Sequence, residues 1–95
     1  MTCQAIQEER DKILHLAASH GATNVRLIGS MARGDERPDS DVDLLVTWRS
    51  GTTLLDHAAL KLELESVLGR KVDIASDGWL RPSVQESVYR DAVPL

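Results

Sequence analysis

The sequence predicts a mixed α/β (α+β) domain, in which helices flank a small mixed sheet of three or more strands. Three observations carry this prediction. The length of 95 residues suits one compact domain. Apolar residues recur with helical spacing near the N-terminus and again in the second half of the chain. Between these segments lie short runs rich in Val, Ile and Leu, which are typical of strands. The resulting order is helix, strand, loop, strand, helix, strand, helix.

Composition narrows the class of protein further. The chain is 42% hydrophobic and 27% charged, which is ordinary for a globular protein, and we expect residues 1–95 to form a single domain. A formal net charge of −4 argues against direct nucleic-acid binding, because phosphate contacts need a basic face. No apolar stretch approaches the roughly 20 residues of a membrane span. A lone cysteine indicates a reducing compartment, so we expect a cytoplasmic protein without membrane contacts.

The N-terminal half is expected to hold one helix and one strand. Apolar residues at spacings of three, four and seven predict a helix over 2–20, and Gly21 supplies the left-handed residue that ends it. A short β-branched run predicts a strand over 25–28. The polar segment 31–40 then forms a loop, with room for one helical turn after Ser30.

The C-terminal half is expected to alternate strands and helices. Thr53 and Asp56 have the spacing of a capping box, which predicts that a helix begins there and ends at Gly69. Pro82 suits the first position of a final helix. The expected elements are a strand over 41–47, a helix over 53–68, a strand over 71–76 and a helix over 83–92.

The helix over 53–68 is apolar on more than one side. We interpret it as packed against both the sheet and a neighbouring helix. The alternative is that one stripe is a docking surface for another protein. One stripe contains Leu55, Ala58, Ala59 and Leu62, and the other contains Leu60, Leu64, Val67 and Leu68.

Three aspartates form the first part of a candidate site. Asp41 and Asp43 are two residues apart on one strand, so their side chains project from the same face. Asp73 lies between apolar residues on a later strand. If the two strands are close, the three carboxylates converge, and their mutual repulsion favours a bound cation. Oxygen ligands of this kind suit Mg²⁺ together with substrate phosphates.

Gly29 and Ser30, at the end of the first strand, form the second part. Glycine lets a phosphate approach the backbone, and the following N–H groups and the Ser30 hydroxyl can donate to its oxygens. A phosphate cradle beside a carboxylate cluster fits two-metal phosphoryl or nucleotidyl transfer. Arg33 is near enough in sequence to reach a triphosphate. The alternative is a solvated loop in which Arg33 and Arg37 are balanced by nearby acids.

The stretch GSMARGDERPDSDVDLLV, residues 29–46, resembles the signature of the DNA polymerase β-like nucleotidyltransferase superfamily. With this length and the later VDI strand, the chain resembles the minimal nucleotidyltransferases encoded as antitoxins in prokaryotic two-gene modules. The resemblance implies that Gly29 and Ser30 hold the nucleotide phosphates. It also implies that Asp41 and Asp43 bind the Mg²⁺ ions and that Asp73 completes the catalytic and metal-binding set.

The resemblance further implies a partner, a HEPN-domain toxin with ribonuclease activity, and a hetero-oligomer. Such antitoxins transfer AMP from ATP to a tyrosine of the toxin, or act mainly by binding it. The leading hypothesis is therefore a Mg²⁺-dependent protein adenylyltransferase, with a binding-only antitoxin as the alternative. A third hypothesis, a small-molecule nucleotidyltransferase, ranks lowest because similar enzymes usually carry a further domain for the acceptor.

Overall fold

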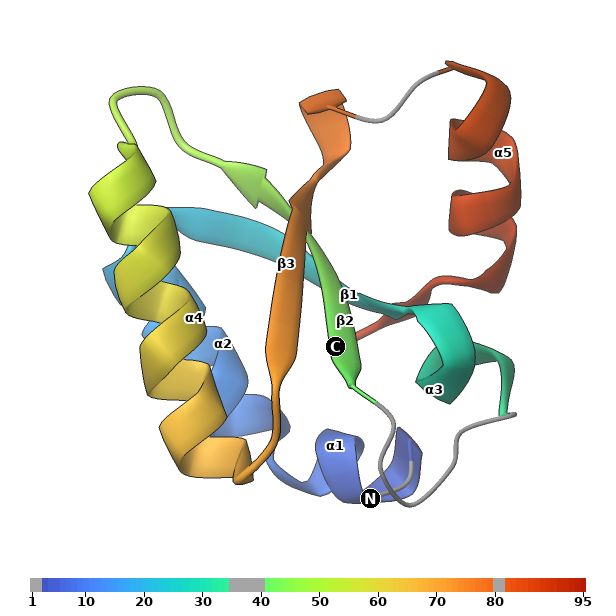
Figure 1. The fold of residues 1–95 in the computed structure, drawn as a ribbon, viewed down its shortest axis with the longest axis horizontal. Coiled ribbons are helices and arrows are strands. Elements are labelled where there is room, and N and C mark those ends of the chain that lie inside the picture. The colour runs from blue at the N-terminus through green and yellow to red at the C-terminus, as the bar shows by residue number, and fades with distance from the viewer. Residues whose placement is uncertain (1–2, 35–40, 80–81) are drawn as a thin grey trace.

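A four-stranded sheet forms the centre of the described part of the chain, which comprises residues 3–34, 41–79 and 82–95 of this computed structural model. Along the chain the elements are α1 (Cys3–Glu8), α2 (Arg10–Ser19), β1 (Ala22–Ile28), α3 (Gly29–Arg33), β2 (Val42–Trp48), α4 (Leu54–Leu68), β3 (Val72–Ser76), the 3-10 turn η1 (Asp77–Trp79), α5 (Pro82–Asp91) and β4 (Val93–Pro94) (Figure 1). The strand order is β3-β2-β1-β4. The mixed α/β class predicted from the sequence is confirmed.

The directions of the strands decide where their ends meet. Strand β1 runs antiparallel to both β2 and β4, whereas β3 runs parallel to β2. Helices α2 and α4 lie on one side of the sheet and α5 lies on the other (Figure 1). Because β2 and β3 are parallel, their first residues lie at the same end of the sheet. The end of β1 and the start of α3 lie there too, since Ile28 pairs with Asp43.

The single helix predicted over 2–20 is wrong in one respect, because it is divided at Glu9 into α1 and α2. The Glu9 N–H donates to the Ile6 carbonyl at 3.0 Å, a three-residue spacing that turns the chain. Ile6 and Ile13 are both fully buried, although they belong to different helices. Burial of both side chains in the same core therefore overrides a continuous helix.

Strand β1 begins at Ala22, three residues earlier than the predicted strand over 25–28. The register shifts between Thr23 and Arg26, where β1 has one residue more than β2. Asn24 lies in this bulge with φ of 53°, a left-handed conformation that asparagine tolerates better than most residues. The bulge keeps both Ala22 and Val25 buried. Simple alternation could not predict this arrangement.

Strand β4 was missing from the sequence prediction. Its residues pair with Arg26 and Leu27 of β1, and the Leu95 N–H donates to the Val25 carbonyl at 3.0 Å. A two-residue strand that contains a proline has no periodic pattern. Its pairing depends on a distant strand with a free edge.

Helix α4 begins and ends as predicted. The Thr53 hydroxyl accepts from the Asp56 N–H at 3.3 Å, the Asp56 carboxylate accepts from the Thr53 N–H at 3.0 Å, and Gly69 is left-handed with φ of 66°. The predicted packing of both apolar stripes is wrong for one of them, because Leu55 is 81% exposed and Leu62 is 65% exposed. In the other stripe Leu60, Leu64 and Leu68 enter the core, whereas Val67 is 40% exposed.

The core lies between the sheet and α2 and α4. On β2, alternate residues face the core, and the residues between them face the opposite side of the sheet. The buried core residues are Ile6, Ile13, Ala17, Ala22, Val25, Leu27, Met31, Val42, Leu44, Val46, Leu60, Leu64, Leu68 and Val72.

None of the helices described here is long and apolar enough to cross a membrane.

Candidate active site

The three aspartates singled out in the sequence lie at one end of the sheet. Asp43 of β2 is paired in register with Asp73 of β3, so these two side chains lie on neighbouring strands on the same face. Asp41 precedes β2 and is two residues from Asp43, which places it on that face as well. The parallel β2–β3 pair thus brings together carboxylates that are 30 residues apart in sequence.

Gly29 is packed directly against Asp43. A Cβ atom at Gly29 would overlap the Asp43 Oδ2 atom and lie 3.2 Å from the Asp43 Cβ atom. The backbone of Gly29 is also left-handed, with φ of 75°, which other residues adopt at a cost. Only glycine meets both conditions without strain. The first turn of α3, with Ser30 as its second residue, therefore starts beside the Asp43 carboxylate.

Electrostatic repulsion within this cluster is visible at Asp43. Burial raises the pKa of Asp43 above its ordinary value of 3.8, and the charges of Asp73 and Asp41 raise this pKa further. The positive charges of Arg33 and Lys71 lower it, without cancelling the rise. Arg33 is thus close enough to act on the site. Arg37 lies outside the described residues.

Two lysines that sequence reasoning missed face the outer two aspartates. The Lys71 ammonium lies 3.9 Å from the Asp41 Oδ2 atom, and the Lys61 ammonium lies 3.6 Å from the Asp73 Oδ1 atom. Lys71 could have been found from strand register, since it precedes β3 as Asp41 precedes β2. Lys61 comes from α4 and has no such signal in the sequence.

The fit of this site to Mg²⁺ depends on the kind of ligand atom. Among the residues that the structure describes, no three Asp, Glu, His or Cys side chains converge closely enough to hold a metal ion in their present rotamers. Two of the three aspartates are instead paired with lysines. The set offers carboxylate oxygens, which are the ligands of Mg²⁺, and a bound cation would relieve the repulsion at Asp43. The residues therefore fit the ion by their chemistry.

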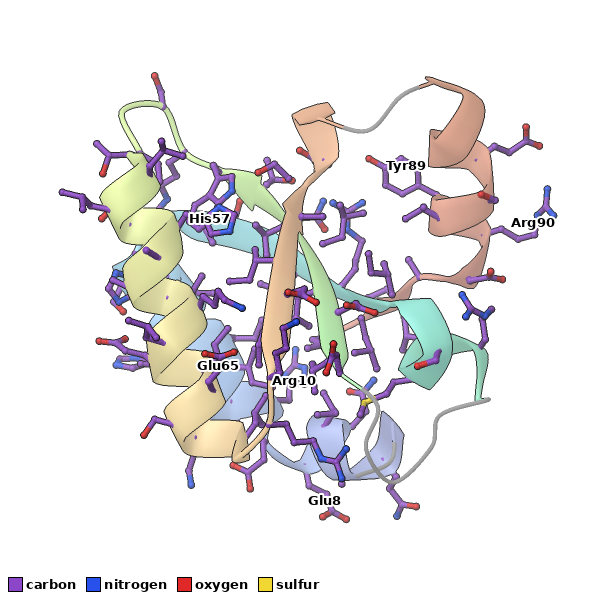
Figure 2. The ribbon with its side chains drawn as sticks, in the orientation of Figure 1. Glu8, Arg10, His57, Glu65, Tyr89 and Arg90 are labelled. Atoms are coloured by element: carbon purple, nitrogen blue, oxygen red, sulfur yellow. The ribbon has the colours of Figure 1, made fainter. Side chains whose placement is uncertain are left out.

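A cavity lies at the opposite end of β2 from the aspartates. It has a volume of about 360 Å³ and is lined by Trp48, Thr52, Thr53, Leu54 and His57. The rings of Trp48 and His57 stack with centroids 5.5 Å apart, and Figure 2 shows His57 beside the end of the sheet. Because Asp43 is near the start of β2 and Trp48 is its last residue, this cavity is separate from the aspartate cluster. The side chain of the other tryptophan, Trp79, lies outside the described part of the structure.

Comparison with protein families assigns residues 10–93 to a family described as the nucleotidyltransferase domain. A relative from Methanocaldococcus jannaschii, provisionally named a protein adenylyltransferase, is 36% identical over 90 residues, which cover 95% of this chain and 97% of the relative. The protein adenylyltransferase MntA of Thermococcus cleftensis is 33% identical over 91 residues, which cover 90% of this chain and 92% of the relative.

Solved structures agree with this comparison. A structure provisionally described as a minimal nucleotidyltransferase is 52% identical, with a TM-score of 0.89. The match covers 100% of this chain and 97% of the chain in that structure. A crystal structure of a toxin–antitoxin with AMP-PNP is 21% identical, with a TM-score of 0.75 over 88% of this chain and 69% of its own. The second likeness shows the fold alone.

Proposed function

This chain belongs to the nucleotidyltransferase domain family, and we propose that it is an antitoxin that transfers AMP from ATP to a hydroxyl group of a partner toxin. One observation carries the proposal: the Gly29–Ser30 turn lies against Asp43, and Asp43 is in register with Asp73. A phosphate-binding turn and a carboxylate cluster are then close enough to act on one triphosphate. The names of the two curated relatives support transfer of AMP to a protein.

Each part of the site has its own task in this reaction. Gly29 keeps the backbone open beside Asp43, so that a phosphate can reach the N–H groups of the following turn. The Ser30 hydroxyl and Arg33 donate to phosphate oxygens. Asp41 and Asp43 would hold the Mg²⁺ ions, with Asp73 completing the set. When bound, two such ions neutralise charge on the phosphates and make the acceptor hydroxyl easier to deprotonate.

The chemical step is a displacement at the α-phosphorus of ATP. The acceptor oxygen forms a bond to the α-phosphorus, the bond to pyrophosphate breaks, and the hydroxyl proton passes to the Asp73 carboxylate. Asp73 lies on the edge strand β3 and its side chain is 52% exposed, so an acceptor can reach it from outside the sheet. We propose a tyrosine of a HEPN-type ribonuclease as that acceptor, and the cytoplasm as the place of reaction. The toxin–antitoxin complexes with the same fold support a protein partner.

The test uses ATP labelled on either the α- or the γ-phosphate, with Mg²⁺ and the toxin encoded by the adjacent gene. Transfer of AMP labels the toxin from α-labelled ATP and not from γ-labelled ATP. Replacement of one toxin tyrosine at a time by phenylalanine then identifies the acceptor. Neutralisation of the toxin without any label would contradict the enzymatic proposal.

A binding-only antitoxin is the second candidate, because the apolar stripe of α4 is exposed at Leu55 and Leu62 and could cover a partner. The double variant Asp41→Asn with Asp43→Asn separates the two. An enzyme loses protection against the toxin when these carboxylates are removed. A protein that acts only by binding keeps it, since neither residue belongs to the apolar stripe.

A further inference from the structure

We infer that Lys61 is a positioning residue for Asp73, and that Glu65 and the backbone of Val72 hold Lys61 in place. The inference rests on the proposed function, in which Asp73 faces the acceptor. It assigns a role in transfer to a lysine and a glutamate of α4. The three residues of the clamp are Lys61, Glu65 and Val72.

The contacts of the clamp are short and mutual. The Lys61 ammonium donates to the Val72 carbonyl at 2.6 Å and to the Glu65 Oε2 atom at 3.3 Å. The same Oε2 atom accepts the Val72 N–H at 3.0 Å. Figure 2 shows Glu65 on the side of α4 that faces β3. The ammonium group is thus held by a backbone oxygen and a carboxylate, and its nitrogen lies 3.6 Å from the Asp73 Oδ1 atom.

The position of β3 explains why such a clamp is needed. This strand is at the edge of the sheet, so alternate N–H and C=O groups point away from β2 and lack a strand partner. Val72 presents one such pair, and the two α4 side chains satisfy both of its groups. Asp73 is the next residue and pairs with Asp43. A clamp on Val72 therefore fixes the backbone from which the Asp73 side chain projects.

The charge of Lys61 acts on the carboxylate as well. The Asp73 side chain is 52% exposed, and without a partner it would sample several rotamers in water. An ammonium held beside Oδ1 restricts these rotamers and leaves Oδ2 able to accept another partner, because a carboxylate has two acceptor oxygens. Asp73 is thereby kept oriented beside Asp43 while the acceptor approaches.

Another lysine on the surface serves as a matched control. Lys12 pairs with Glu9 at 3.5 Å across one helical turn, and its side chain is 70% exposed. Such exposed pairs contribute little to stability. Lys61, in contrast, is 32% exposed and bonds to a backbone carbonyl. Replacing each lysine by methionine removes a charge from a side chain of similar length.

The experiment compares Lys61→Met, Lys61→Arg, Glu65→Gln and Lys12→Met in AMP transfer to the toxin, with binding of a non-hydrolysable ATP analogue and Mg²⁺ measured by calorimetry. We expect Lys61→Met to lower kcat about 10-fold, as loss of an orienting partner commonly does, with the Kd of the analogue changed less than about twofold. Lys61→Arg restores most of kcat, Glu65→Gln lowers it less, and Lys12→Met leaves it unchanged.

Two results would overturn the inference. One is a wild-type kcat in Lys61→Met, and the other is a loss of analogue affinity in proportion to kcat. If Lys61→Met does not fold, as judged by its melting curve, then Glu65→Gln and Lys61→Arg are compared instead. A wild-type kcat in Glu65→Gln, or a loss of analogue affinity in proportion to its kcat, would then overturn the inference. Failure of the proposed function is seen separately, because the wild-type protein itself would then transfer no AMP.

Discussion

Glu65 and Asp43 both lie beside the start of β3, and their surroundings shift their pKa values in opposite directions. Glu65 accepts the Val72 N–H and pairs with Lys61, and the hydrogen bond from Val72 is the main cause that lowers its pKa. Asp43 is partly buried beside Asp73 and Asp41, and its pKa is raised. The ionised form is therefore favoured by folding at Glu65 and disfavoured at Asp43.

The difference separates Glu65, the structural carboxylate that holds α4 and Lys61 in place, from Asp43, a functional carboxylate in the proposed reaction. Glu65 is satisfied by its own chain, so ionisation there helps to hold α4 against β3. Asp43 lies where like charges gather, as expected of a site that binds a cation and a triphosphate in the proposed function. Residues that stabilise the fold and residues that serve the proposed reaction are thus neighbours with opposite electrostatics.

Removal of a functional carboxylate should affect transfer far more than removal of the structural one. Asp73→Asn should lower kcat for AMP transfer by about 10²- to 10⁴-fold, since a group that positions or deprotonates the acceptor is lost. Glu65→Gln should lower kcat by less than about 10-fold. Initial rates with α-labelled ATP measure both. Equal losses in the two variants would remove the distinction between the carboxylates.

Two glycines with similar backbone angles test the contact between the Gly29 turn and Asp43. Gly34→Ala should cost about 1–2 kcal/mol of stability, because φ is 79° and an added Cβ meets no described atom within 4 Å. Gly29 has φ of 75°, and an added Cβ there would also force Asp43 to move. Gly29→Ala should therefore cost more stability than Gly34→Ala, and the rate of AMP transfer should fall. Denaturant unfolding and transfer rates measure the pair. Similar costs would mean that the contact with Asp43 is not tight.

The pH dependence of stability should have opposite signs for the Glu65 and Asp43 carboxylates. Glu65 has a lowered pKa, so Glu65→Gln should lower the melting temperature at neutral pH, and this deficit should shrink as the pH falls below the ordinary value of 4.5. Asp43 has a raised pKa, so Asp43→Asn should raise the melting temperature at neutral pH, and this gain should vanish as the pH falls below 3.8. Melting curves of both variants and the wild-type protein between about pH 3 and pH 7 check the signs. Shifts of the same sign at neutral pH would contradict the contrast.

The sequence was sufficient to predict the placement of those parts of the candidate site that lie close together along the chain. The Gly29–Ser30 turn and the Asp41–Asp43 pair are determined by local strand and turn geometry, and strand alternation placed Asp73 on the polar face. Lys61 could not be predicted, because its contact with Asp73 depends on how α4 packs against the free edge of β3. Such packing is set by long-range burial rather than by local spacing.

The same limit explains the errors in the fold. The division at Glu9 depends on the burial of Ile6 against a core that distant elements build. Strand β4 depends on the free edge of β1. The exposure of Leu55 and Leu62 could not be predicted either, since an apolar stripe looks the same whether a helix or a partner covers it.

Melting curves of the wild-type protein and Asp43→Asn, each with and without Mg²⁺ and ATP, test whether Asp43 binds the cation and the triphosphate. We predict that Asp43→Asn melts at the higher temperature without ligand, because like-charge repulsion is relieved. At a ligand concentration about 100 times Kd, binding should stabilise the wild-type protein by about 2.7 kcal/mol, and the variant by far less. A wild-type melting temperature unchanged by Mg²⁺ and ATP, or an equal rise in Asp43→Asn, would contradict the account.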